Sequence, residues 1–138
     1  MKLCIIGTGY VGLVSGACFS DLGNSVICVD KDHKKIDNLK KGVMPIYEPG
    51  LDELVKKNYR SGKLKFTSNL KESVLKSDII FICVGTPKKK NSNAADLTQI
   101  YKLAKQISKY DKKFKIIITK STVPVTTGDK IEKIISKK

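Results

Sequence analysis

The stretch "MKLCIIGTGYVG", residues 1–12, decides the fold. An apolar run leads directly into three glycines, at positions 7, 9 and 12. The following stretch, "YVGLVSGACFSDLG" at 10–23, has helical character and ends at a glycine. A short apolar strand, a glycine-rich turn and a helix, in this order, predict the first unit of a doubly wound parallel sheet.

The rest of the chain repeats this alternation of strand and helix. Short, continuously apolar strands between helices indicate a parallel sheet that is covered on both faces. We therefore predict an α/β, Rossmann-like doubly wound parallel sheet in a single domain, nearly complete, with one strand fewer than the full dinucleotide-binding fold. The further strands are expected at 25–30, 63–68 (an edge strand), 78–85 and 115–121, and the helices at 31–42, 51–62, 69–77, 96–110 and 126–138.

Length and composition describe one globular domain. The chain has 138 residues, of which 41% are hydrophobic and 29% are charged. No apolar run approaches the roughly 18 residues that a membrane span needs, and the N-terminus lacks the long apolar core of a signal peptide. We expect a cytoplasmic protein without a membrane partner.

The formal net charge of +14 comes almost entirely from lysine, because Arg60 is the only arginine. Proteins that read nucleic acids depend on arginine forks and stacking aromatic residues. Neither is concentrated here, even beside the "KKK" cluster at 88–90. We expect a solvated lysine surface and no nucleic-acid partner, with an anionic ligand as a further interpretation.

Cysteine and histidine usage gives little support to a metal site. His33 is the only histidine and lies in a charged helix start, and no two cysteines have C-x-x-C spacing. Buried, reduced thiols are expected, as is typical of the cytosol. The four cysteines are Cys4, Cys18, Cys28 and Cys83.

The glycine turn matches the pattern G-x-G-x-x-G. Gly7 permits a tight turn, Gly9 leaves no side chain between the backbone and a pyrophosphate, and Gly12 lets the helix pack close to the strand. Free N–H groups and the helix dipole then favour phosphate at this helix end. The turn therefore predicts a nucleotide site.

Asp30 ends the second strand, 18 residues after Gly12. A carboxylate there accepts hydrogen bonds from adenosine ribose hydroxyls and repels a 2′-phosphate, which favours NAD over NADP. The alternative is an ordinary turn and a surface aspartate that closes a strand. Lys35, in the next helix, is either a ribose or phosphate contact or a solvated lysine.

Two later segments place hydroxyl groups beyond the ends of strands, "VGTP" at 84–87 and "KSTVP" at 120–124. Such hydroxyls bind a ribose, a nicotinamide amide or a water. Alternatively, Ser121 or Thr122 caps the following helix. A third segment, "PIYEPGL" at 45–51, is too rich in proline for a regular element, and its composition indicates no chemical role.

Taken together, these motifs resemble the UDP-glucose/GDP-mannose dehydrogenase family, and its UDP-glucose branch in particular. They occur in the family's order and at compatible spacings across the whole chain. The motifs are "GTGYVGLVSG" at 7–16, "PIYEPGL" at 45–51, "FICVGTP" at 81–87, "ADL" at 95–97 and "KSTVP" at 120–124.

The resemblance implies oxidation of a sugar C6 alcohol to a carboxylate, with two hydride transfers to two NAD⁺ through covalent intermediates on a catalytic cysteine. It implies UDP-glucose as the substrate and a homodimer or larger assembly for the full-length enzyme. Thr122 matches a family threonine that helps to position a catalytic water. The matching cofactor residues are Gly7, Gly9, Tyr10, Val11 (through its N–H) and Gly12 for the pyrophosphate, Asp30 and Lys35 for the ribose, and Thr86, Ser121 and Thr122 lining the site.

The sequence also departs from the family pattern. It has no "FGGSC"-like motif for the nucleophile, and "VPVTTG" at 123–128 differs from the commoner "VPVGT" form. The family's catalytic lysine, glutamate and sugar-binding domain come after position 138. The resemblance therefore implies that residues 1–138 are a truncated NAD-binding domain, inactive alone.

Other interpretations stay open on the residues. A sister enzyme acting on GDP-mannose or UDP-N-acetylmannosamine carries related motifs. A free-standing NAD-sensing regulatory domain shares the glycine turn and the acidic strand end, although "PIYEPGL" and "KSTVP" argue against it. A methyltransferase that uses S-adenosylmethionine shares the first turn, but the three-glycine spacing disfavours it.

Overall fold

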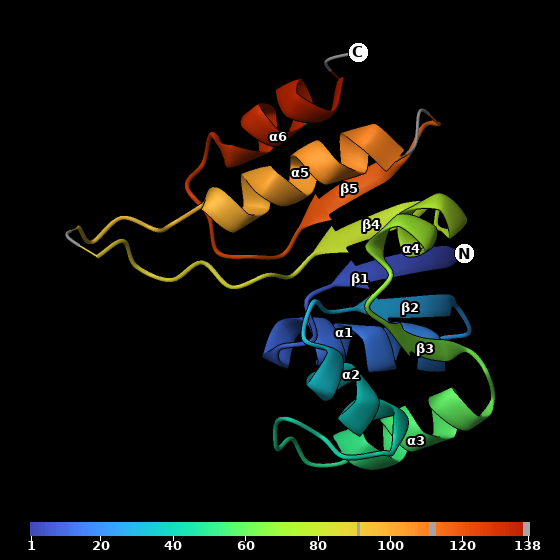
Figure 1. Ribbon diagram of the computed structural model, residues 1–138. Helices are drawn as coiled ribbons and strands as arrows, with labels where there is room; N and C mark the ends of the chain where they lie inside the picture. The colour runs from blue at the N-terminus through green and yellow to red at the C-terminus, as the bar shows by residue number, and fades with distance from the viewer. Residues whose placement is uncertain (91, 111–112, 137–138) are drawn as a thin grey trace.

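The computed structural model describes residues 1–90, 92–110 and 113–136, and in these ranges strands and helices follow one another as predicted (Figure 1). The last two residues of the predicted helix 126–138 and residue 91 of the loop before 96 lie outside the described residues. The elements are β1 Lys2–Ile6, α1 Tyr10–Asp21, β2 Ser25–Val29, α2 His33–Lys40, α3 Leu51–Arg60, β3 Leu64–Thr67, α4 Leu70–Lys76, β4 Ile79–Ile82, α5 Thr98–Tyr110, β5 Ile116–Thr119 and α6 Thr127–Ser136.

The strands form one parallel sheet in the order β3-β2-β1-β4-β5. The chain builds outward from β1 to β2 and β3, and then crosses back to β4 on the other side of β1. This confirms the predicted α/β doubly wound fold and the edge position of strand 63–68, which is β3. The strand order reverses between β1 and β4, and such folds bind ligands at this point, beyond the carboxyl ends of the strands.

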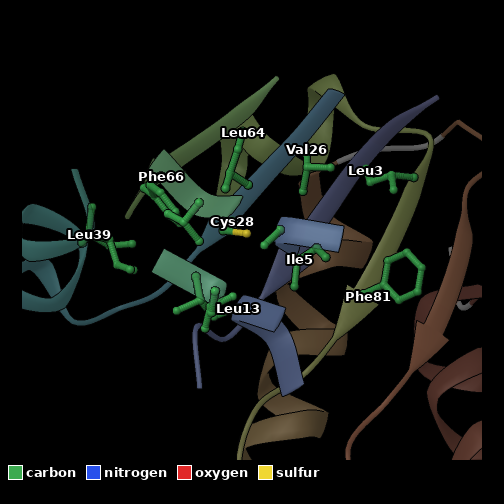
Figure 2. Close-up of a cluster of buried hydrophobic side chains, with 13 residues drawn as sticks. Leu3, Ile5, Leu13, Val26, Cys28, Leu39, Leu64, Phe66 and Phe81 are labelled. Carbon is green, nitrogen blue, oxygen red and sulfur yellow. The ribbon is translucent and has the colours of Figure 1, made fainter. Parts of the chain in front are cut away.

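The alternation of side chains along the strands gives the sheet two buried faces. In β1, Leu3 and Ile5 point to one face, and Cys4 and Ile6 to the other. Helices α1, α2 and α3 cover the first face and α4, α5 and α6 the second (Figure 1). Figure 2 shows the first cluster, in which Leu13 of α1 packs beside the side chains of β1, β2 and β3.

The expectation that all four thiols are buried is wrong for Cys18. Cys4 and Cys28 are buried in strands, but Cys18 is exposed on α1. The buried side of α1 is formed by Leu13, Ala17 and their helical neighbours, so that Cys18 falls on the opposite side. Cys83 is half-buried, since it follows the end of β4.

Within the described ranges, no helix is both long and apolar enough to cross a membrane. In the same ranges, no group of three or more His, Cys, Asp or Glu side chains is placed to hold a metal ion.

Candidate nucleotide-binding cleft

A cleft of about 840 Å³ opens at the reversal of strand order. Its lining residues come from the carboxyl ends of β1, β2 and β4, which lie at the left of the sheet in Figure 1, and, on the other side, from the start of α4 and from α5. Its lining includes the predicted Gly7, Gly9, Asp30 and Lys35. The structure therefore brings the glycine turn and the acidic strand end to one place.

Two glycines of the turn are required by the backbone itself. Gly7 has a φ of 102°, and a Cβ added there would lie 2.6 Å from the carbonyl oxygen of Cys83. A Cβ at Gly12 would lie 1.8 Å from the carbonyl oxygen of Gly7. Larger residues would push β1, β4 and α1 apart. These contacts explain the tight turn and the close helix packing that the motif predicts.

Gly9 is different, because a Cβ there would meet no atom within 4 Å. Its backbone is extended, with φ −75° and ψ −167°, and it caps α1 without a side chain. Gly9 lines the cleft and directly precedes the first N–H groups of the helix. The turn thus fits a pyrophosphate, which needs close approach to backbone N–H groups at a helix N-terminus.

Asp30 joins the end of β2 to the glycine turn. Thr8 donates to Oδ2 of Asp30 from its backbone N–H at 2.9 Å and from its hydroxyl at 2.7 Å. Lys35 Nζ donates to the same oxygen at 3.1 Å, and the N–H of Asp32 donates to Oδ1 at 3.1 Å. The carboxylate is therefore fixed in orientation at the edge of the cleft, and its side chain is only 11% exposed.

The environment keeps this carboxylate charged. Burial by itself raises the pKa of Asp30, but hydrogen bonds from Thr8, Asp32 and Lys35 outweigh burial and lower the pKa to about 2. An ionised carboxylate accepts hydrogen bonds from ribose hydroxyls and repels phosphate. The charge state thus fits the predicted role.

We expect part of the folding stability to depend on this charge. The pKa of Asp30 is depressed in the folded chain, so its contribution is present above the ordinary value of 3.8 and is lost as the pH falls toward about 2. The stability advantage of wild type over Asp30→Asn should shrink by about 2 kcal/mol between neutral pH and about pH 2. Urea unfolding of both proteins at both pH values measures this difference in unfolding free energy. A difference that is constant with pH would contradict this account.

Lys35 is both an ion-pair partner and part of the cleft. It is 30% exposed, so its Nζ is shared between Asp30 and solvent. Three further lysines line the same cleft, whereas Asp30 is the one carboxylate among the described lining residues. This excess of positive charge attracts an anionic ligand. The additional lysines are Lys31, Lys71 and Lys102.

The two hydroxyl-bearing segments meet at the ends of β4 and β5. Thr86 Oγ1 donates to the carbonyl of Thr122 at 3.0 Å, and Ser121 Oγ donates to the carbonyl of Val84 at 2.6 Å. Capping of α6 by Ser121 or Thr122 is excluded, because α6 begins at Thr127. All three residues lie beside the cleft rather than in its lining. Their contact with a cofactor stays a prediction.

Sequence reasoning missed part of the site. Thr8 holds Asp30 through two hydrogen bonds, but a threonine at a variable position of the motif gives no signal. Helix α5 contributes Gln99, Leu103, Gln106 and Tyr110 to the cleft. Their spacing of three to four residues places them on one helix face, a pattern that could have been recognised.

The sequence was compared with known families. A model of the UDP-glucose/GDP-mannose dehydrogenase family, NAD binding domain, matches residues 1–138. The chain belongs to this family. It is thus an NAD-binding domain by family, and its cleft lies at the strand ends, where doubly wound folds bind their ligands.

Relatives and solved structures agree with this assignment. The chain is 55% identical to UDP-glucose 6-dehydrogenase of Rhizobium meliloti (strain 1021) over 98% of its own length and 31% of that protein. It is 51% identical to UDP-glucose 6-dehydrogenase TuaD of Bacillus subtilis (strain 168), over 99% of its length and 29% of that protein. The chain therefore spans less than a third of the length of these curated relatives.

Solved structures of the family share the fold closely. A ternary complex of GDP-mannose dehydrogenase from Pseudomonas aeruginosa has a TM-score of 0.90 and 39% identity, with 98% of this chain and 32% of that chain covered. UDP-glucose dehydrogenase from the archaeon Pyrobaculum islandicum has a TM-score of 0.87 and 31% identity, with 98% and 33% covered.

Proposed function

We propose that residues 1–138 form the cofactor domain of a UDP-glucose 6-dehydrogenase, which oxidises UDP-glucose to UDP-glucuronate with two NAD⁺. One observation carries the choice of sugar: two relatives that match nearly the whole chain at 55% and 51% identity are both named UDP-glucose 6-dehydrogenase. The geometry of the cleft supports the cofactor half of this proposal.

In this proposal each part of the cleft has a separate task. Bound NAD⁺ supplies the hydride acceptor. The N–H groups of the first turn of α1, including those of Tyr10 and Val11, hold the pyrophosphate. Asp30 and Lys35 orient the adenosine ribose. Thr86, Ser121 and Thr122 border the nicotinamide side, where Thr122 helps to position a water.

None of the buried or half-buried thiols is suited to be the nucleophile. Burial raises the pKa of Cys4 to about 12 and that of Cys83, which lines the cleft, to about 11. Burial also raises the pKa of Cys28. A nucleophilic cysteine needs the opposite shift, because the thiolate is the reactive form. Cys18 is exposed on α1 and is not among the described residues that line the cleft. We therefore expect the isolated chain to form no NADH from UDP-glucose and NAD⁺, measured by absorbance.

Domain replacement tests the proposal. In a first chimera, residues 1–138 replace the corresponding segment of the Rhizobium meliloti enzyme. In a second chimera, they replace that of the Pseudomonas aeruginosa GDP-mannose dehydrogenase. We expect UDP-glucose oxidation by the first chimera and little GDP-mannose oxidation by the second. In a control chimera, the corresponding segment of Bacillus subtilis TuaD replaces that of the Rhizobium meliloti enzyme. Activity of this control shows that the junction between the two parts is tolerated.

The opposite pattern of activity would assign the chain to another branch of the family. Activity of the second chimera without activity of the first favours a GDP-mannose enzyme. Inactivity of both, beside an active TuaD control, contradicts a catalytic cofactor domain.

A further inference from the structure

The loop 43–50 between α2 and α3 has no role in the function described so far. In the structure, hydrogen bonds connect the second half of this loop to the glycine turn. Tyr10, the first residue of α1, donates from its hydroxyl to the carboxylate Oε2 of Glu48 and lies 3.2 Å from the carbonyl oxygen of Tyr47. A residue of the G-x-G-x-x-G motif therefore spans from the phosphate-binding turn to a segment 38 residues later in the chain.

The rest of the loop is held by other contacts. Met44 and Ile46 pack against the buried cluster on this face of the sheet, while the side chain of Tyr47 is 85% exposed. The loop borders a hollow of about 670 Å³ next to the start of α3. Apolar packing thus fixes the first half of the loop, and the contact of Tyr10 with Tyr47 and Glu48 fastens the second half.

We propose that Glu48 is a positioning residue of the cofactor site, because its hydrogen bond to Tyr10 holds loop 43–50 and the first turn of α1 together as one unit. This inference rests on the proposed pyrophosphate site at that turn. The first turn of a helix has N–H groups without helical partners, and it gains order from contacts made by its side chains. A cradle ordered before binding loses less entropy when the ligand arrives.

The charge of Glu48 strengthens this contact. A hydrogen bond to an ionised acceptor is about twice as strong as one between neutral groups. The hydrogen bond to Glu48 also raises the pKa of Tyr10 above its ordinary value of 10.0, and the hydroxyl, which is protonated at neutral pH in either case, is the donor of this bond. Pyrophosphate binding and loop order should therefore depend on each other.

Four single variants of the intact chain, and the double variant that combines Tyr10→Phe with Glu48→Ala, test the proposal. Tyr10→Phe removes the donor, Glu48→Ala removes the acceptor, and Glu48→Gln keeps an acceptor without the charge. Glu53→Ala is the matched control, because it removes an exposed carboxylate in the first turn of α3. NADH affinity is measured by calorimetry, and hydrogen exchange of residues 43–50 is followed with and without NADH.

We expect Tyr10→Phe and Glu48→Ala each to weaken NADH binding about three- to tenfold, the scale of one hydrogen bond. The double variant should lose no more than either single variant, and Glu48→Gln should recover part of the loss. In wild type, NADH should slow exchange in residues 43–50, and Glu48→Ala should abolish this slowing.

Two results overturn the inference in distinguishable ways. If wild type binds NADH and Glu48→Ala binds as tightly as Glu53→Ala, Glu48 does not position the cofactor site. If wild type binds no NADH, the proposed cofactor role of this cleft fails, and the role of Glu48 fails with it.

Discussion

Gly9→Ala should abolish most NADH binding and leave the fold intact. The Cβ at this position meets no protein atom within 4 Å, and the backbone angles suit alanine. The free energy of unfolding should therefore change by no more than about 0.5 kcal/mol. Gly9 lines the cleft, and in the proposed site the pyrophosphate approaches its backbone, so an added methyl group should lower the affinity for NADH at least about tenfold.

Gly12→Ala is the contrasting variant for this prediction. Its Cβ would lie 1.8 Å from the carbonyl oxygen of Gly7, so that α1 must move away from β1. We expect a loss of about 3 kcal/mol or more in unfolding free energy, because a packed backbone cannot absorb the overlap. Urea unfolding and calorimetric titration of both variants separate the two effects. Gly9→Ala that binds NADH like wild type would contradict a pyrophosphate site at the turn.

Asp30→Asn should remove most of the discrimination between NADH and NADPH. In wild type the charged carboxylate repels a 2′-phosphate, and we expect a preference for NADH of roughly a hundredfold. The amide retains the shape and one acceptor for Thr8 but has no charge, and it frees Lys35, whose Nζ lies 3.1 Å from the carboxylate. The preference should then fall to about tenfold or less.

Parallel titrations with the two reduced cofactors measure this ratio. The matched control is Asp37→Asn, which removes an exposed carboxylate on α2 without touching the cleft. A ratio that is the same in wild type and Asp30→Asn would show that Asp30 does not face the ribose.

The fold was predictable because each strand is a short apolar run and several elements end at a glycine. Gly7 follows the first strand, and Gly23 and Gly42 follow the first two helices. All three glycines have positive φ in the structure. The alternation of these segments predicts the parallel order, since each crossover needs a helix. Cys18 was misplaced because α1 is apolar nearly all round, and its composition does not indicate which side faces the sheet.

The candidate site was predictable only where one segment contains the whole signal. The turn from Gly7 to Gly12 and the strand end at Asp30 are local patterns with a direct physical meaning. The bond from Thr8 to Asp30 and that from Tyr10 to Glu48 join segments 22 and 38 residues apart. Such contacts depend on how the elements pack, and the sequence of each segment alone does not predict them.

The central claim is that this chain binds NAD in the cleft between the glycine turn and Asp30. Calorimetric titration of the wild-type chain with NADH and, separately, with NADPH tests it most directly. The account predicts saturable binding of NADH and binding of NADPH that is weaker by roughly a hundredfold. Absence of NADH binding, or tighter binding of NADPH, would contradict it.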